Sequence, residues 1–325
     1  MPSKKAESSF APAYGTTLAQ RAPVAVGTTT QIDLQTGSDL GARATSLRLV
    51  STHEVHGCAL LLGTRRLLAN RYRLKRLLGR GASSVVYLAE DTVLDADVTL
   101  KVFVRNSRAA SVRLEERIRP ELRIARKVIH PNVSRVYDIG RAGDELFLTM
   151  EHAEGHTLRE VLVAEKLASK RAHGFVLGVL DALVAIHAAG VVHRDLKPSN
   201  IIVRKDDSVV VIDFGLAADL AQGTSLGGVA LGTPRYSAPE QMRGEEATRR
   251  SDVYSFGLVA REVYARAYPK GIPSRIATIL DRATATDPEQ RTPSAVELRE
   301  ELGRAIARRR VLSQIRRSVA LLFSL

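Results

Sequence analysis

The sequence contains a single cysteine, which limits the disulfide bonds that the chain is able to form. Cys58 has no second cysteine with which to form an internal disulfide. Long hydrophobic runs are also lacking, because no stretch reaches the roughly 18 to 20 apolar residues that a membrane helix needs. The N-terminal residues have no apolar core of the kind found in secretory signals. We therefore expect a cytoplasmic protein without disulfides.

Acidic residues are missing from the end of the chain. The 325 residues have a formal net charge of +13, and the part from Gly303 onward contains six arginines and no acid. Because the positive excess is partly confined to this tail, it does not indicate a specific nucleic-acid partner. With 45% hydrophobic and 26% charged residues, the chain is suited to one large globular unit or to two lobes with extensions.

Regular periodicity is absent from residues 1–68. This segment mixes Ser, Thr, Ala and Gly with scattered hydrophobic residues, which predicts a mostly flexible N-terminal extension. It contains His53, His56 and Cys58, whose side chains are able to ligate a metal. No second cluster completes a tetrahedral set, so a structural or solvent-exposed role is favoured over a metal site.

Strand patterns begin at Asn70. Two runs with strand-like composition flank a turn that contains Gly79 and Gly81, which predicts strand, glycine turn and strand. An ordinary hairpin uses the same glycines, so the turn alone does not indicate a ligand. The next strand, residues 98–103, carries Lys101 among apolar neighbours. This lysine either points to solvent from the polar face or is buried beside an acidic partner.

One charged helix and two more strands follow. Residues 111–129 are rich in helix formers and charge, whereas residues 133–139 and 145–150 have strand composition on either side of a glycine turn. The helix carries several acids, and acids on an exposed helix face usually have no specific role. Five strands and one helix would make a small lobe.

The densest charge lies in residues 191–203, VVHRDLKPSNIIV, a polar loop between two apolar runs. Burying such a loop is costly unless its charges have partners, which indicates a site of chemistry. Asp195 is able to accept a proton, Lys197 to stabilise negative charge, and Asn200 to offer an oxygen to a hard cation. Asp213 ends the next apolar strand, although acids before glycine also occur in ordinary turns.

Together these segments resemble protein kinases of the bacterial, eukaryotic-like (Hanks-type) serine/threonine family. The polar loop matches H-R-D-L-x-x-x-N, residues 213–215 match D-F-G, and residues 98–101 are similar to V-A-I-K with Thr99 in place of alanine. The glycine turn resembles the glycine-rich loop. The resemblance covers about residues 70–302, and Lys197 is typical of the serine/threonine class.

The resemblance implies an α+β, two-lobed protein kinase fold. We expect a β-rich N-lobe with one helix at residues 69–153 and a larger helical C-lobe at residues 154–302, shortened after its central helix. A basic amphipathic tail, residues 303–325, would follow. The tail either lies on an anionic membrane or is docked or frayed, and the second is favoured because its apolar stripe is short.

The resemblance also implies catalytic roles. The activity is transfer of the γ-phosphate of ATP to serine or threonine hydroxyls of proteins. Asp195 would orient and deprotonate the hydroxyl, and Lys197 would stabilise the transferring phosphoryl group. Lys101 would hold the α and β phosphates. Its expected partner is Glu121, nine residues before the H-P-N element.

Cofactors and partners follow from the same resemblance. ATP is expected with Mg²⁺, or alternatively Mn²⁺, on Asn200 and Asp213. The residues expected around the nucleotide are Gly79, Gly81, Val86, Lys101, Glu151, Ala153 and Ile202. A protein substrate and self-association for autophosphorylation are the expected partners. The alternative is a pseudokinase scaffold without efficient turnover, which Thr99 and the shortened C-lobe favour.

Regulation and support are implied by later motifs. Residues 216–240 resemble an activation segment, in which Thr224 and Ser225 are phosphorylation candidates because Arg194 is able to pair with a phosphate. Ordinary turn residues are the alternative there. Asp252 is expected to brace the catalytic loop. The helix that contains it is expected to begin with a Ser or Asp cap. The last expected contact is an ion pair between Glu240 and Arg291.

Overall fold

A computed structural model describes residues 67–81, 84–103, 108–214 and 235–322 of the chain. All of them belong to one unit of the chain. Several predicted features lie outside the described residues: His53, His56 and Cys58 in the N-terminal extension, and Thr224 and Ser225 in the expected activation segment.

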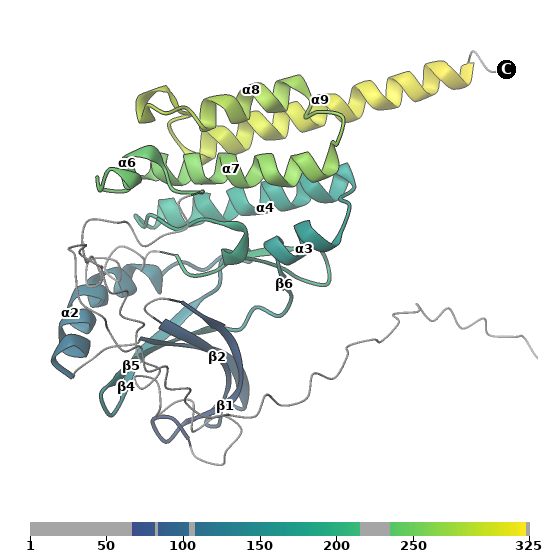
Figure 1. The fold of residues 1–325 in the computed structure, drawn as a ribbon. Helices are drawn as coiled ribbons and strands as arrows, with labels where there is room; N and C mark the ends of the chain where they lie inside the picture. Colours follow the sequence, from purple (N-terminus) through teal and green to yellow (C-terminus); the bar gives the residue numbers. More distant parts are fainter. Residues whose placement is uncertain (1–66, 82–83, 104–107, 215–234, 323–325) are drawn as a thin grey trace, which may run out of the picture. The chain divides into compact units, whose positions relative to one another are not determined.

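The N-terminal lobe is built on one antiparallel sheet with the order β1-β2-β3-β5-β4 (Figure 1). Its strands are β1 (Tyr72–Arg80), β2 (Ser84–Asp91), β3 (Ala96–Phe103), β4 (Val136–Ala142) and β5 (Glu145–Glu151). The helix α2 (Arg108–Ala125) contacts β5. The predicted five strands and one helix are therefore confirmed, and strand residues such as Tyr87, Leu100 and Phe147 are buried.

The fourth strand begins later than predicted. It starts at Val136 rather than at Val133, and it continues through Ala142. The reason is that Val133 forms a bridge with Val211, and the Ser134 N–H donates to the Val211 carbonyl at 3.0 Å. These backbone groups are thus committed to the C-terminal lobe before the strand starts.

The C-terminal lobe is mainly helical. Its helices are α3 (Leu158–Ala164), α4 (Ser169–Ala188), α6 (Pro239–Met242), α7 (Arg249–Ala267), α8 (Ser274–Ala283) and α9 (Ala295–Leu322). A small sheet contains β6 (His156–Thr157), β7 (Ile201–Val203) and β8 (Val209–Val211), with the short 3₁₀ turns η2 (Pro198–Asn200) and η3 (Pro288–Gln290). The helix α4 contacts α7, α9 and β8, so it forms the centre of the lobe (Figure 1).

The helix α4 is the one described helix long and apolar enough to cross a membrane, and 56% of that stretch is buried inside the protein. Phe175, Leu180 and Leu183 are among its fully buried side chains. The central helix of a folded domain passes the same test of length and composition, so the observation carries little weight.

The helix α7 does not begin with the predicted Ser or Asp cap. It starts at Arg249 after Thr248, whose hydroxyl accepts from the Arg250 N–H at 3.2 Å. Ser251 reciprocates, because its hydroxyl accepts from the Thr248 N–H at 2.9 Å. Threonine therefore caps the helix and leaves the Asp252 carboxylate for other contacts.

The C-terminal lobe is short after α7, as predicted. Only residues 268–273 separate Ala267 at the end of α7 from Ser274 at the start of α8. The following helix α9 is continuous from Ala295 to Leu322, so the predicted start of a tail at residue 303 falls within a helix. Its C-terminal end extends past α4 and α7 in Figure 1.

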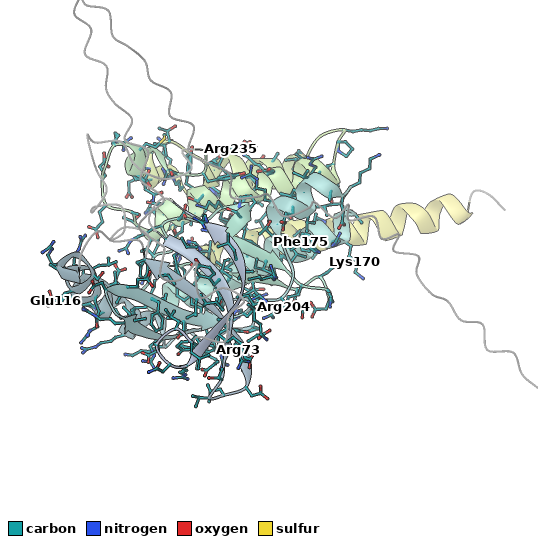
Figure 2. All side chains as sticks on the ribbon, turned by 60° about the horizontal axis from the view of Figure 1, so that its bottom comes forward. Arg73, Glu116, Lys170, Phe175, Arg204 and Arg235 are labelled. Atoms are coloured by element: carbon teal, nitrogen blue, oxygen red, sulfur yellow. The ribbon has the colours of Figure 1, made fainter. Side chains whose placement is uncertain are left out.

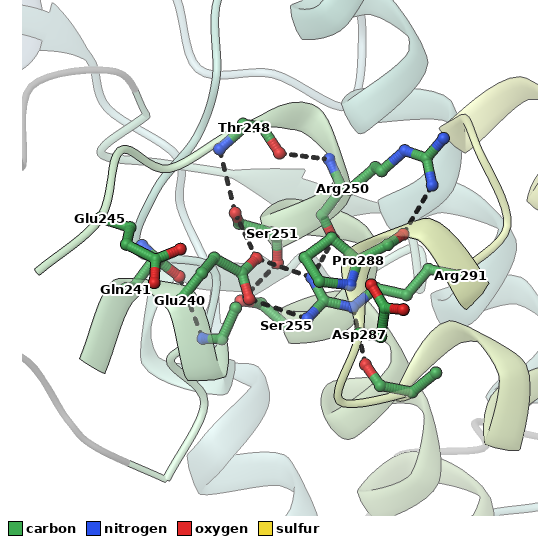
Figure 3. Close-up of polar contacts among 12 residues, drawn as sticks. Glu240, Gln241, Glu245, Thr248, Arg250, Ser251, Ser255, Asp287, Pro288 and Arg291 are labelled. Atoms are coloured by element: carbon green, nitrogen blue, oxygen red, sulfur yellow. Dashed lines mark hydrogen bonds and ion pairs between the residues drawn. The ribbon is translucent and has the colours of Figure 1, made fainter. Parts of the chain in front are cut away.

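A buried ion pair joins two distant parts of this lobe, as predicted. Arg291 donates to both carboxylate oxygens of Glu240, at 2.7 and 2.8 Å, and the Ser251 hydroxyl donates to the same carboxylate (Figure 3). The guanidinium also donates to the carbonyls of Arg250, Ala285 and Thr286. Every charge is thus paired, which is the condition for burying it.

Arg291→Met should destabilise the protein in a pH-dependent manner. Burial raises the pKa of Glu240, but hydrogen bonds from Arg291 and Ser251 outweigh it and hold the pKa at about 2, below its ordinary 4.5. A lowered pKa stabilises the fold above pH 4.5 and ceases to do so as the pH falls through 2. Urea unfolding should show a loss on the order of 3 kcal/mol at pH 6 that shrinks toward pH 2.

The matched control is Arg243→Met, which removes an exposed ion pair with Glu245. Its free energy of unfolding should stay close to that of the wild type, because exposed pairs contribute little. A loss in Arg291→Met that is equal at pH 6 and pH 2 would contradict this role of the buried pair.

Candidate active site

The predicted catalytic loop, residues 191–203, is fixed by apolar anchors on both sides. Val191, Leu196 and Ile201 are buried, and Ile201 begins β7. His193 is fully buried, and burial lowers its pKa, so the imidazole is neutral. Its Nδ1 accepts from the Asp195 N–H at 3.3 Å. The loop therefore presents Asp195 from a backbone that packing and hydrogen bonds hold in place.

Asp252 braces the loop from α7, as predicted. Its carboxylate accepts from the N–H groups of His193 at 2.7 Å and Arg194 at 2.9 Å. His187 on α4 adds a contact of 2.8 Å between its Nε2 and the same carboxylate. Arg194 has a φ of +70°, a conformation that side-chain-bearing residues seldom adopt. The buried carboxylate holds this backbone in a shape that costs energy.

The three polar residues proposed from the loop lie together. Lys197 Nζ is 2.7 Å from Asp195 Oδ2, and the Asn200 amide donates to the Asp195 carbonyl at 2.9 Å and to Oδ2 at 3.2 Å. The turn η2 places Asn200 here. The carboxylate of Asp195 thus has two donors from its own loop, which fix its orientation.

Lys101 is buried with an acid, which excludes the solvent-facing alternative. It lies in the middle of β3 opposite Val86 on β2 and Leu148 on β5. Its Nζ is 3.0 Å from Asp213 Oδ1, and the lysine side chain is 10% exposed. Two residues 112 positions apart in the chain are therefore joined as an ion pair.

The predicted pair between Lys101 and Glu121 is wrong for this structure. Glu121 Oε1 instead accepts from Arg194 NH1 at 2.6 Å, and its other oxygen, Oε2, is buried without a hydrogen-bond partner. The physical reason is competition: Asp213 supplies the charge that Lys101 requires, and Arg194 supplies the charge that Glu121 requires. Glu121 therefore contacts the catalytic loop and not β3.

The three glutamates of α2 face different surroundings. Glu116 is exposed and lies at the outer side of α2 (Figure 2). Glu115 pairs with Arg119 and Arg141. Only Glu121 among these three reaches the catalytic loop.

The residues expected around a nucleotide come from several elements. Gly79 is on β1, Val86 on β2, and Ile202 on β7, and the Gly81 N–H donates to the Ser84 carbonyl at 2.8 Å. Glu151 ends β5, and Ala153 follows it. The Glu151 carboxylate is 3.3 Å from Arg204, so its side chain has a partner of its own. Their nucleotide-binding role stays a prediction.

Three contributors to the site were not predicted from the sequence. The first is Gln241 on α6, which donates to the Arg194 carbonyl at 2.9 Å. The second is His152, whose Nδ1 lies 3.3 Å from the Thr99 hydroxyl. The third is His187, which occupies the apolar face of α4. A polar residue at a buried helical position is a signal that would have singled out His187. Nothing in the sequence singles out Gln241.

The donor set suits a hard divalent cation in the presence of phosphates. The Asn200 amide nitrogen is occupied by Asp195, which leaves its oxygen for a ligand, and Asp213 has one oxygen beyond the one that contacts Lys101. Among the described residues no three His, Cys, Asp or Glu side chains form a metal cluster. Magnesium bound with phosphates needs only one or two protein carboxylates, so these residues fit it.

These features define a class of protein: a two-lobed fold in which a loop aspartate held by a lysine and an asparagine is joined by an ion pair between a strand lysine and a second aspartate. The chain belongs to the protein kinase family, since the family model described as protein kinase domain matches residues 72–302. Members of that family use ATP with a divalent metal.

The relatives are bacterial serine/threonine-protein kinases. The chain is 32% identical to PrkC of Bacillus subtilis over 75% of its own length and 41% of the relative. It is 38% identical to pkn2 of Myxococcus xanthus over 62% of its length and 25% of the relative. The chain thus spans less than half the length of these curated relatives.

A solved structure shows the same fold. The kinase domain of PknI from Mycobacterium tuberculosis aligns with 72% of this chain and 95% of that chain, with a TM-score of 0.57 and 26% identity. The predicted two-lobed protein kinase fold is therefore confirmed.

Asp252→Asn should weaken the catalytic loop. An amide offers one acceptor oxygen and turns its NH₂ toward groups that are themselves donors, so at least one backbone N–H loses its charged partner. Loss of hydrogen bonds to a buried charge should lower the free energy of unfolding by about 3 kcal/mol in a urea titration. Asp281→Asn, at an exposed ion pair on α8, is the control and should change little. Equal losses in both variants would contradict the bracing role.

Proposed function

We propose that this chain is a serine/threonine protein kinase that transfers the γ-phosphate of ATP to protein hydroxyls. The observation that carries the proposal is the Asp195 carboxylate, held by Lys197 and Asn200 on a loop that packing and Asp252 fix. The kinase names of the relatives support the same activity. A carboxylate with this support is suited to orient a hydroxyl and accept its proton.

The other residues divide the work of positioning and charge stabilisation. Lys197 lies beside Asp195 and is placed to stabilise negative charge on the transferring group. Lys101 would hold the α and β phosphates, and backbone N–H groups of the turn with Gly79 and Gly81 would approach them. Most of the reduction in barrier comes from such positioning and preorganised charge.

Magnesium is the proposed ion, with manganese as a substitute. Asn200 and Asp213 would hold it through oxygen atoms, and the ion supplies neutralisation of phosphate charge when bound. Asp213 has a φ of +59°, so its backbone is held in the left-handed region that favours glycine. The ion pair with Lys101 offsets part of the cost of that conformation.

The setting of the reaction is also proposed. The substrate is a protein with serine or threonine, and a second copy of the chain is one such substrate, which gives autophosphorylation. A membrane contacted by the C-terminal residues is the less favoured partner. A cytoplasmic location is proposed from the sequence alone.

Asp195→Asn tests the proposal. Incubated with labelled ATP and magnesium, the wild type should label itself or a mixture of protein substrates, whereas the variant should do so about 100-fold or more slowly, because it lacks the general base. Asp206→Asn, at an exposed carboxylate beyond β7, should label like the wild type. Equal label on wild type and Asp195→Asn would favour the scaffold alternative.

Glu121 must change partners if it is to fix Lys101 during the reaction. Phosphoryl transfer in kinases uses the ion pair between the strand lysine and the helix glutamate. Here the orphaned Glu121 Oε2 is buried beside no donor, so a second partner would relieve the cost of its desolvation. Pro120, inside α2, lacks the N–H for a helical hydrogen bond, which gives the helix a natural point of bending.

Glu121→Gln should therefore lower kcat by on the order of 100-fold in the same assay, because Lys101 loses its fixed position. Glu116→Gln is the matched control on the same helix, since that side chain is exposed. If Glu121→Gln retained wild-type kcat, the pair of Lys101 with Asp213 would suffice and the exchange of partners would be refuted.

A further inference from the structure

A hollow between α8 and α9 carries a concentration of arginine. It has a volume of about 370 Å³, and its lining is made by Arg275, Thr278, Ile279, Arg282, Glu301, Arg304, Ala305 and Arg308. Four of these eight residues are arginines, and two come from each helix. The guanidinium groups therefore surround the hollow from both sides.

The charges of the hollow are only partly compensated. Glu301 is the one acid in the lining, and it already accepts from Arg282, which also donates to the Thr292 hydroxyl at 3.2 Å. Arg304 is 3.4 Å from Glu300 in an exposed pair, which is a weak interaction. Arg275 and Arg308 are exposed, and neither has an ion pair within 4 Å among the described residues. The hollow thus keeps a net positive charge.

The floor and the surroundings make the hollow accessible. Ile279 and Ala305 are partly buried and provide an apolar base between the arginines. The connection between α7 and α8, residues 268–273, contains no helix among the described residues. No helix of this connection therefore covers the outer face of α8. The site is remote in sequence from the catalytic loop, and none of its lining residues belongs to that loop or to the residues expected around the nucleotide.

We propose that this hollow, the α8–α9 arginine groove, docks an acidic segment of a protein partner. Guanidinium forks match carboxylates in geometry and charge, and arginines on opposite rims are able to hold a chain that lies between them. As a docking site for kinase substrates, this inference rests on the proposed function, but binding itself does not require catalysis.

Docking through the groove should lower KM for proteins that carry an acidic segment and leave kcat unchanged. The reason is that the contact is made away from the reacting atoms, so it contributes equally to ground state and transition state. Its strength should fall with added salt, because exposed charges are screened.

The test uses the full chain and a fluorescein-labelled deca-glutamate peptide, followed by fluorescence anisotropy. The wild type should bind, and the double variant Arg275→Glu/Arg308→Glu should bind at least tenfold more weakly. The control, Lys170→Glu/Arg266→Glu, makes the same change of net charge at exposed positions on α4 and α7, and should bind within twofold of wild type. Circular dichroism should show that both variants keep the wild-type Tm within a few degrees.

Two further arms separate the explanations. Asp195→Asn should bind the peptide as the wild type does, so a failure of docking is distinguished from a failure of phosphate transfer. Vesicles of phosphatidylglycerol and phosphatidylcholine test the bilayer as a partner. The proposal is overturned if the wild type does not bind the peptide, if both double variants bind it equally well, or if the groove arginines are needed for vesicles and not for the peptide.

Discussion

The carboxylate of Asp252 is the contact on which the catalytic loop depends. It lies in the first turn of α7 and accepts from two consecutive backbone N–H groups, those of His193 and Arg194. The second of these residues has a positive φ, and such a backbone persists only where its surroundings enforce it. Because Asp195 follows directly, the position of the proposed base is decided by a buried acid 57 residues later in the chain.

Other buried charges extend this support outward. Gln241 holds the Arg194 carbonyl, and its short helix α6 is anchored by Glu240 to Arg291. The contacts run from Arg291, which directly follows η3, through α6 to the catalytic loop, so charge pairing and not apolar packing alone fixes the floor of the site. A buried pair that is fully hydrogen-bonded gives definite geometry, although its net contribution to stability is modest.

On the side of the site formed by β3 and α2, the ion pairs differ from the pair of strand lysine and helix glutamate that phosphoryl transfer in kinases uses. Lys101 pairs with Asp213, and Glu121 pairs with Arg194, so each acid expected to assist the reaction has a cation nearby. The pair of Glu121 uses only its Oε1, since Oε2 is buried without a hydrogen-bond partner. Reaching the arrangement used in phosphoryl transfer means exchanging one ion pair for another. A bound nucleotide or phosphate is able to shift such a balance between two arrangements.

The sequence by itself determined much of the molecule. Strand and helix patterns predicted the five strands and one helix of the N-terminal lobe. The motifs and their order indicated the family, and the resemblance implied the pair of Glu240 with Arg291 and the contact of Asp252 with the loop. These predictions succeeded because apolar periodicity and motif order are local properties that burial in the fold preserves.

Only the tertiary structure decided which partner each charge takes. Glu121 and Lys101 were paired by analogy, whereas the fold brings Arg194 to one and Asp213 to the other, and ion pairing depends on distances of a few ångströms that sequence spacing does not fix. The same holds for the α8–α9 arginine groove, whose members lie up to 33 residues apart in the chain. The charged residues are known from the sequence, but packing decides which residues lie beside them.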